Sequence, residues 1–261
     1  MKRNIYLTIG KYLYLISFLL LEVIIYISYM FDDWVKSILE NNALVKYESI
    51  ILINIFSITC FIVQLIRDKT NNEYDRNSRF DTIFVVIALV FTLMSDTFLL
   101  YLGKFYEIGV SLFIVTQMMY YLRLIFSTDF SKKRILISSI IRGGSFIICL
   151  IIMPIVKMWS LLNIVTIFYF INLVMNFIDS LISTILLRKD KTRFISSIIF
   201  TVGLLLFIGC DINVGLSNLI GKGGRLIWSF YLPSQVIIVM SSIKMLNIRL
   251  NGVSVYEETQ C

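Results

Sequence analysis

The sequence predicts an all-α integral membrane protein of about eight transmembrane helices. Of its 261 residues, 58% are hydrophobic and only 16% are charged, and the mean hydropathy is +0.84. A single soluble core of this size cannot hide so much apolar surface. Several apolar runs reach the length of roughly 20 residues that spans a bilayer. The alternating pattern of a membrane β-strand is absent, so we expect the spans to be helices.

The apolar runs give the expected helices in chain order. The first follows a basic N-terminal segment, exceeds the apolar core of a signal peptide and is followed by no small-residue cleavage site, so we expect it to be retained. The sixth is long enough to tilt. Longer connections are expected near 32–48, 67–80 and 215–225, within one membrane domain that ends in a polar tail at 251–261. The expected spans are residues 12–31, 49–66, 81–102, 107–127, 135–156, 159–187, 194–214 and 226–243.

The charge distribution predicts the orientation of these helices. The net charge is +7, but the basic residues lie in short clusters between apolar runs, which is typical of loops that face the cytoplasm and not of a nucleic-acid interface. If the N-terminus is inside, the inside segments carry most of the 24 Lys and Arg residues. We therefore expect both termini in the cytoplasm, an even number of helices and no nucleic-acid partner.

Several kinds of catalytic site are excluded by composition. The chain has no histidine, which excludes Ser-His-Asp and Cys-His catalysis and every histidine-ligated metal site. Its four cysteines show no paired spacing, so we expect neither a disulfide framework nor a zinc site. No phosphate-binding glycine loop and no G-x-S-x-G motif occurs. We expect no metal and no cofactor.

Two predicted hairpins share a pattern of polar residues, which predicts an internal repeat. Asp96 lies in MSDTFLLYLGK and Asp211 in GCDINVGLSNLIGK, each after a small residue and before a Gly-Lys pair. Further along, Gln117 ends SLFIVTQ and Gln235 ends SFYLPSQ. A repeat unit of four helices gives two halves of the same orientation, related by an axis along the membrane normal. We place the halves at roughly 1–130 and 131–250.

Asp96 and Asp211 are the expected catalytic residues. A charged side chain inside hydrocarbon costs several kcal/mol and requires a reason. Both lie toward the outer ends of their expected helices, with Asp211 slightly shallower, and a pseudo-twofold arrangement of the halves places the two carboxylates face to face. The structural alternative is that each reaches interfacial water or accepts one hydrogen bond between helices.

Five other polar side chains are candidate substrate contacts. Gln117 and Gln235 can donate to a carboxylate or hold a substrate oxygen, although the same amides can serve only as hydrogen bonds between helices. Tyr231 can supply a hydroxyl group. Asn172 and Asn176 are spaced i, i+4 on one face of the sixth helix and are expected to line the same cavity.

Four further charged residues within the spans have structural interpretations. We expect Arg123 and Arg142, toward the inner side, to extend their guanidinium groups to lipid phosphates. We expect Glu22 and Asp179 to be partners for these arginines or for backbone groups.

The segments around the two aspartates resemble motifs of the YhhN, or lysoplasmalogenase-like, family. The segment ALVFTLMSDTFLLYLGKFYEIGVSLFIVTQMMYYLRLIF resembles the first family pattern, which is Gly-Asp followed by leucines and then by Gly, Phe, His and Tyr. The segments VGLLLFIGCDINVGLSNLI and SFYLPSQVII resemble the second family pattern, in which Gly-x-x-x-Phe leads to Ser-Asp and is followed by Tyr-x-x-x-Gln. The chain differs from these patterns at Ser95, Cys210 and Gln117, where the family has Gly, Ser and His.

The resemblance implies a membrane hydrolase that splits the vinyl ether of lysoplasmalogen, or of a related ether lysolipid. The products would be a fatty aldehyde and a glycerophospho-alcohol. The reaction needs an acid that protonates the alkene carbon, a base for water and a negative environment for the oxocarbenium ion. Asp96 and Asp211 can supply all three, as paired carboxyls do in glycosidases. The expected partners are a lysophospholipid and the bilayer of a bacterial plasma membrane.

Two other functions fit the same residues. Parallel repeats with intramembrane carboxylates also occur in small-molecule and proton-coupled transporters, although glycine and proline, at 12 and 2 residues, are few for broken helices. A non-catalytic lipid-binding protein, in which Ser95, Cys210 and Gln117 mark lost activity, is the third. The oligomeric state is left open.

Overall fold

The computed structural model describes residues 2–35, 42–70, 76–128, 130–220 and 224–243, and these residues form helices and no strand. Seven helices are long and apolar enough to cross a membrane, and the apolar part of the eighth, Leu226–Ser241, is shorter. The chain is therefore an all-helical, multi-pass membrane protein. The elements are α1 (Lys2–Val35), α2 (Asn42–Thr70), α3 (Arg76–Asp96), the π-helix η1 (Thr97–Leu102), α4 (Tyr106–Ser127), α5 (Lys132–Ile155), α6 (Leu161–Leu186), the 3₁₀ turn η2 (Leu187–Lys189), α7 (Lys191–Ile220) and α8 (Gly224–Ser241).

Several helices continue into segments that the sequence assigns to long connections. α1 ends at Val35 and α2 begins at Asn42, inside the predicted connection 32–48. α2 reaches Thr70, and α7 continues to Ile220. The prediction of long connections was wrong because hydropathy detects only the apolar part of a helix, whereas backbone hydrogen bonds continue into polar turns beyond it. The predicted tail 251–261 lies outside the described residues.

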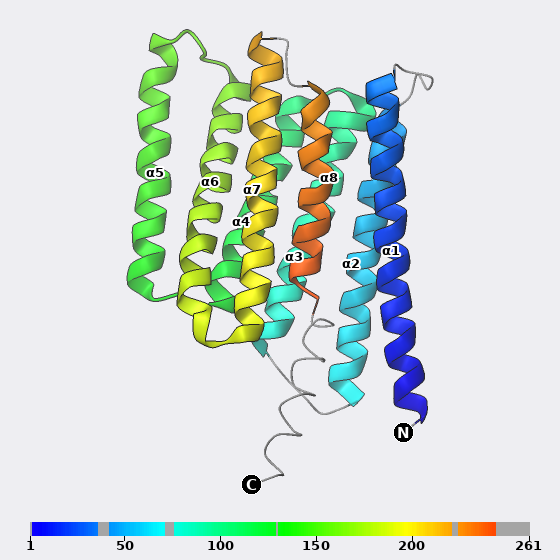
Figure 1. The fold of residues 1–261 in the computed structure, drawn as a ribbon. Coiled ribbons are helices and arrows are strands. Elements are labelled where there is room, and N and C mark those ends of the chain that lie inside the picture. Colours follow the sequence, from blue (N-terminus) through cyan, green and yellow to red (C-terminus); the bar gives the residue numbers. More distant parts are fainter. Residues whose placement is uncertain (1, 36–41, 71–75, 129, 221–223, 244–261) are drawn as a thin grey trace.

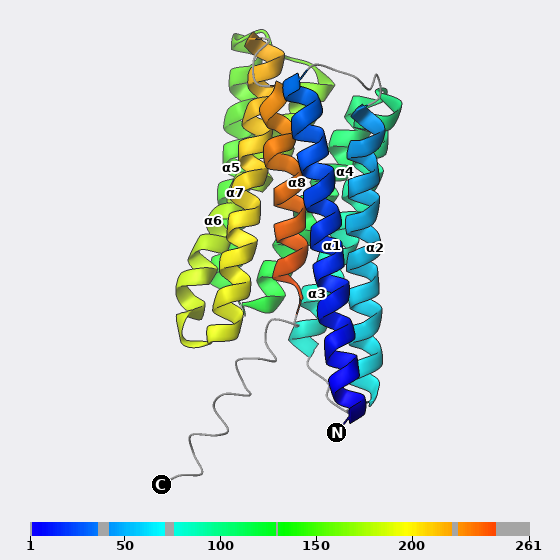
Figure 2. The ribbon, with the colours of Figure 1, turned by 45° about the vertical axis from the view of Figure 1, so that its right-hand side comes forward.

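The helices run side by side in one bundle, and α1 begins at the same end of it at which α8 ends (Figure 1). α5 lies at one edge, packed against α6, and α1 lies at the opposite edge (Figure 1). α8 lies between α1 and α7 (Figure 2) and contacts α1, α2 and α7. The side of the membrane at which the two termini lie stays a prediction.

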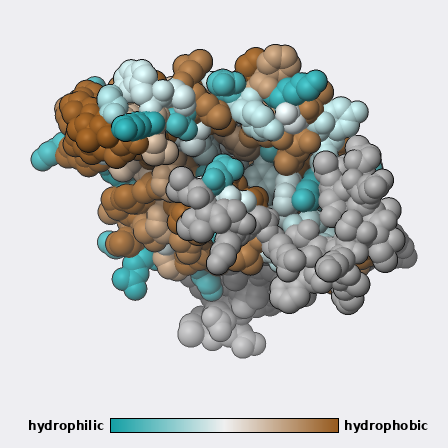
Figure 3. Space-filling view, turned by 90° about the horizontal axis from the view of Figure 1, so that it is seen from above, coloured by the Kyte–Doolittle hydropathy of each residue, from teal (hydrophilic) through white to brown (hydrophobic). Residues whose placement is uncertain are grey.

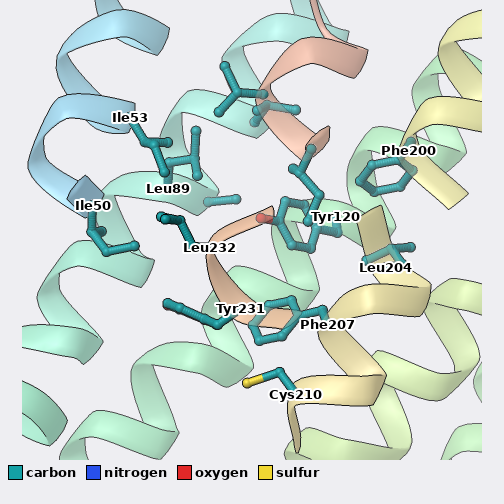
Figure 4. Close-up of a cluster of buried hydrophobic side chains, with 14 of the residues drawn as sticks. Ile50, Ile53, Leu89, Tyr120, Phe200, Leu204, Phe207, Cys210, Tyr231 and Leu232 are labelled. Atoms are coloured by element: carbon teal, nitrogen blue, oxygen red, sulfur yellow. The ribbon is translucent and has the colours of Figure 1, made fainter. Parts of the chain in front are cut away.

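The outward faces of the edge helices are apolar. On α5 the isoleucines at 140, 147, 151 and 155 are exposed. Lipid tails are as apolar as these side chains, so such faces are suited to contact lipid, while polar side chains turn inward. Inside the bundle, side chains from α2, α3, α4, α7 and α8 meet in a buried cluster (Figure 4). Polar groups beside this cluster are therefore shielded from lipid.

Close packing at two glycines joins the helices of the two hairpins. A Cβ atom on Gly109 of α4 would lie 2.6 Å from the Leu99 side chain, and one on Gly203 of α7 would lie 2.6 Å from the Ile238 side chain of α8. α3 packs against α2 and α4, and α7 packs against α6 and α8. A parallel repeat requires such matching neighbours, but the repeat itself stays a prediction.

Candidate active site

Asp96 lies where α3 changes into the π-helix η1. A π-helix is rare and often occurs at a functional site, because its wider turn redirects the side chains around it. The Ser95 hydroxyl donates to the Gly109 carbonyl on α4 at 2.6 Å, and Gly103 ends the π-helix with a φ of 57°, in the left-handed region that favours glycine. These features fix Asp96, whose side chain is buried.

The Asp96 carboxylate is paired with a tyrosine of α8. The Tyr231 hydroxyl donates to Asp96 Oδ2 at 2.5 Å. The Tyr231 ring is held edge-on by Trp228, at 5.1 Å between ring centroids, and by Phe207, at 5.6 Å. Tyr231 was predicted to supply a hydroxyl to this site, and the structure places that hydroxyl on the carboxylate.

The Asp211 carboxylate has a matching arrangement on the other hairpin. The Tyr169 hydroxyl of α6 donates to Asp211 Oδ2 at 2.6 Å. Asp211 is half-buried and lies well inside α7, which continues to Ile220, so its expected position near the end of the helix was wrong. Sequence reasoning missed Tyr169, since no motif surrounds it, although it lies one turn before the candidate Asn172.

The two carboxylate–tyrosine pairs meet through an aromatic cluster formed by Phe113, Tyr169, Phe207 and Tyr231. The Phe207 ring lies 5.6 Å from that of Tyr231 and 6.5 Å from that of Tyr169, and Phe113 contacts Phe207 at 5.8 Å and Tyr169 at 5.5 Å. The Cys210 thiol, below the Tyr231 and Phe207 rings in Figure 4, is close enough to both aspartates to interact electrostatically with each. The two pairs therefore belong to one site.

Three predicted substrate contacts belong to a second group, which we call the guanidinium cluster: Arg142, Asp179, Asn172, Asn176 and Gln117. Arg142 donates to Asn172 Oδ1, Asn176 Oδ1 and Asp179 Oδ2, each at 2.9 Å. Asn176 Nδ2 donates to Gln117 Oε1 at 2.9 Å. The expectation that Arg142 reaches lipid phosphates was wrong, because an adjacent carboxylate neutralises it inside the bundle. Asp179 is confirmed as a partner for an arginine.

Arg123 and Glu22 also have buried partners. Arg123 donates to both Asp81 oxygens, at 2.7 and 3.2 Å, and to the Ser241 hydroxyl at 2.7 Å. It thus joins α4 to α3 and to the end of α8, and its expected extension to lipid phosphates was wrong for the same reason as at Arg142. Glu22 accepts from the Ser49 hydroxyl at 2.6 Å, and within the part of the chain that the structure describes no arginine or backbone group donates to its carboxylate, so the partner expected for it is not the one found.

Two buried glutamines retain unused hydrogen-bonding atoms. Gln235 lies one turn beyond Tyr231 on the same face of α8, and Gln117 lies one turn beyond Phe113 on α4. Among the described residues, Gln235 Oε1 and Gln117 Nε2 have no hydrogen-bond partner. A buried amide atom without a partner costs free energy, so Gln117 Nε2 is suited to donate to a substrate oxygen or a water, and Gln235 Oε1 to accept from a hydroxyl group or a water. Contact with substrate stays a prediction for both.

The end of the bundle nearest the carboxylates is hollowed. Viewed from above, the surface has a depression near its centre, bordered in part by hydrophilic and pale residues (Figure 3). η1 ends and α8 begins at this end of the bundle. Trp228, in the second turn of α8, lies one turn nearer to this end of the bundle than Tyr231.

The comparison with known families agrees with the motifs around the aspartates. Residues 42–242 match the YhhN family, which covers α2 to the end of α8 and includes both carboxylate–tyrosine pairs. No curated protein matches the chain, and no solved structure matches it. The resemblance seen in the sequence is confirmed, and the chain belongs to the YhhN family.

Proposed function

We propose that the protein is a membrane hydrolase that cleaves the vinyl ether bond of lysoplasmalogen, or of a related ether lysolipid. The observation that carries this proposal is a pair of intramembrane carboxylates, Asp96 and Asp211, each hydrogen-bonded by a tyrosine and joined through one aromatic cluster. Membership of the YhhN family is consistent with this activity. The overall reaction adds water across the alkenyl ether and yields a fatty aldehyde and a glycerophospho-alcohol.

Asp96 is the proposed acid. It is the more buried of the two aspartates and lies against aromatic rings, which suits it to meet the apolar alkenyl chain. It gives a proton to the alkene carbon farther from the ether oxygen, and an oxocarbenium ion forms at the other alkene carbon. The Tyr231 hydroxyl then stabilises the Asp96 carboxylate that remains, because a hydrogen bond to an ionised acceptor is about twice as strong as a neutral one.

Asp211 is the proposed base. It is the less buried of the two aspartates, which suits it to receive the attacking water. Its carboxylate removes a proton from the water that attacks the oxocarbenium carbon, and the resulting hemiacetal breaks down to the aldehyde and the alcohol. Tyr169 holds Asp211 in place through the hydrogen bond to Oδ2, which leaves Oδ1 for the water.

The aromatic cluster suits both the chain and the cation of this substrate. The rings of Phe113, Phe207 and Tyr231 give an apolar wall for the alkenyl chain. Their faces also attract a cation, with cation–π energies of about 0.5–2 kcal/mol per contact. The oxocarbenium ion therefore forms between a negative carboxylate and electron-rich rings, which is the environment that lowers the barrier to its formation.

The three departures from the family pattern leave the acid and base in place. Ser95 binds the carbonyl of Gly109, and Gln117 accepts a hydrogen bond from Asn176. Cys210 lies beside both aspartates but supplies neither proton in this scheme. The substituted residues thus remove neither the acid nor the base of the proposed reaction.

The substrate and the location follow from the same proposal. A lysolipid is delivered by the bilayer itself, and the lipid-facing edges of the bundle place the protein there. We propose the bacterial plasma membrane as its location and, from the distribution of basic residues, a cytoplasmic position for both termini. The proposal includes eight membrane-spanning helices in two parallel repeats.

The test uses purified protein in detergent with a 1-alkenyl lysophosphoethanolamine, and measures free aldehyde. The wild-type protein is expected to release aldehyde, and Asp96→Asn and Asp211→Asn are each expected to abolish release. Asp190→Asn, which changes an exposed aspartate between η2 and α7, is the control and is expected to keep full activity. Gel filtration and circular dichroism check that each variant is folded. Normal activity in either folded site variant would contradict the proposal.

A further inference from the structure

The guanidinium cluster fixes the orientation of one side-chain amide that borders the site. Arg142 donates to Asn176 Oδ1 at 2.9 Å, and a guanidinium group has donors but no acceptor. The amide oxygen of Asn176 therefore faces Arg142, and its amide nitrogen faces the other way. That nitrogen donates to Gln117 Oε1 at 2.9 Å and to the Gln117 carbonyl at 2.8 Å. Both ends of the Asn176 amide are thus occupied within the protein.

This series of hydrogen bonds ends at one unused donor. Gln117 is fully buried, and within the part of the chain that the structure describes its Nε2 atom has no hydrogen-bond partner. If the Gln117 amide were rotated by 180°, its nitrogen would face the nitrogen of Asn176, and two donors would be opposed. Arg142 therefore determines, through Asn176, that the unused atom of Gln117 is a donor and not an acceptor.

Gln117 lies beside the aromatic cluster of the site. Phe113, one turn before Gln117 on the same face of α4, contacts Tyr169 at 5.5 Å and Phe207 at 5.8 Å between ring centroids. The Tyr169 hydroxyl in turn donates to Asp211. Gln117 thus belongs to the turn of α4 that follows the contact with the Asp211–Tyr169 pair, which is the half of the site that holds the proposed base.

We infer that Arg142 and Asn176 are positioning residues of the active site, which present Gln117 Nε2 as a donor to a hydroxyl oxygen. This inference rests on the proposed function for the source of that oxygen, which is either the glycerol hydroxyl group of the lysolipid or the attacking water. The vinyl ether oxygen is a poor acceptor here, because it gains positive charge in the oxocarbenium ion and a donor would oppose that change. A hydroxyl oxygen keeps its lone pairs throughout the protonation step.

The alternative is that these residues only tie α4, α5 and α6 together, and two charge-matched variants separate the roles. Asn176→Asp and Asn172→Asp each place one new carboxylate against Arg142, which binds both asparagines at 2.9 Å. Asn172 Nδ2 donates to the Phe168 carbonyl at 2.8 Å, whereas Asn176 Nδ2 donates to Gln117. Asn176→Asp removes that donor, so the Gln117 amide turns its nitrogen toward the new carboxylate and presents Oε1 instead.

Two properties of each variant are measured in detergent. The first is the kcat and KM of aldehyde release. The second is the binding of a 1-alkyl analogue, whose saturated ether has no alkene to protonate, by quenching of tryptophan fluorescence with a brominated chain. Both are repeated with ligands that lack the glycerol hydroxyl group. Gln117→Met is the second site variant, because it removes the amide and leaves the contact of Arg142 with Asn176 in place. Thermal unfolding shows which variants are folded.

We expect Gln117→Met to lower kcat/KM by about 3- to 10-fold, as for the loss of one neutral hydrogen bond, and Asn176→Asp to lower it by at least that factor more than Asn172→Asp does. If the acceptor is the glycerol hydroxyl group, KM rises, analogue binding weakens, and both effects disappear with ligands that lack the hydroxyl. If the acceptor is the attacking water, kcat falls with either ligand and KM stays unchanged.

Equal losses in Asn176→Asp and Asn172→Asp, or a Gln117→Met protein with wild-type kcat and KM, would overturn the inference. Analogue binding needs no turnover, so it separates this inference from the proposed reaction. A wild-type protein that binds the analogue and releases no aldehyde would refute the hydrolase. In that case, hydroxyl-dependent binding that Asn176→Asp weakens more than Asn172→Asp supports the positioning role, and binding that both variants leave unchanged overturns it.

Discussion

Replacing Tyr231 by Phe removes the hydroxyl group that donates to the proposed acid, Asp96, and leaves the surrounding aromatic rings in place. The phenylalanine ring keeps the edge-on contacts with Trp228 and Phe207, but Asp96 loses the hydroxyl that donates to it at 2.5 Å. A hydrogen bond to a charged group contributes about 1.5–3 kcal/mol. If this stabilisation is expressed when Asp96 becomes a carboxylate in the transition state, kcat falls about 10- to 150-fold, since about 1.4 kcal/mol is a factor of ten.

The assay for Tyr231→Phe is the initial rate of aldehyde release at saturating substrate. Tyr47→Phe is the matched control, because it also loses one hydroxyl hydrogen bond, to Thr97 beside Asp96, without touching a carboxylate. We expect it to keep wild-type kcat within about twofold, as for an interaction outside the reacting groups. A Tyr231→Phe rate equal to that of the control, in a folded protein, would refute the proposal that this hydroxyl stabilises the acid.

Three other predictions follow from the same contacts. Tyr169→Phe is expected to slow aldehyde release less than Tyr231→Phe does, because Asp211 becomes neutral when it takes a proton and then no longer needs the Tyr169 hydroxyl. If Tyr169→Phe instead lowered the rate more than Tyr231→Phe, Asp211 would be the acid and Asp96 the base. Asp179→Asn leaves Arg142 without its buried carboxylate and is expected to destabilise the fold by about 3–5 kcal/mol, seen as a lower midpoint in thermal unfolding; an unchanged midpoint would show that the pair is not needed. Gly203→Ala is expected to lower the same midpoint, since the new Cβ would meet Ile238 and the Ser234 carbonyl, whereas Gly143→Ala has open space and leaves it unchanged or higher; equal effects would contradict the close α7–α8 contact.

The helices could be predicted from the sequence, but their ends could not. Apolar runs identify the part of each helix that lies in hydrocarbon, and seven of the eight predicted spans correspond to helices long and apolar enough to cross a membrane. Extensions such as Asn42–Tyr47 in α2 are polar or mixed. Their helical form depends on neighbouring helices, because Tyr47 is fixed by Thr97 and Lys46 by the rings of α1 and α8.

The residues of the site could be predicted where a polar group interrupts an apolar run. Asp96, Asp211 and Tyr231 were identified in this way, or from their place in the repeated pattern. Tyr169 was not, because tyrosine is common in this chain, with 14 residues, and only the fold brings its hydroxyl to Asp211.

The partners of the arginines could not be predicted either. Whether an arginine inside a span extends to lipid or binds a carboxylate depends on which residues face it from other helices. Arg123 and Asp81 are separated by one helical hairpin in the sequence, and Arg142 and Asp179 by another. Hydropathy carries no information on how those hairpins pack.

The central claim is that an aspartic acid of this protein protonates the alkene carbon of a vinyl ether. It is tested most directly by running the reaction in D₂O and measuring the mass of the aldehyde, trapped as it forms. We predict a single deuterium on the carbon next to the aldehyde group, and no aldehyde from Asp96→Asn. The claim would be contradicted if the aldehyde lacked this deuterium, or if the wild-type protein released no aldehyde.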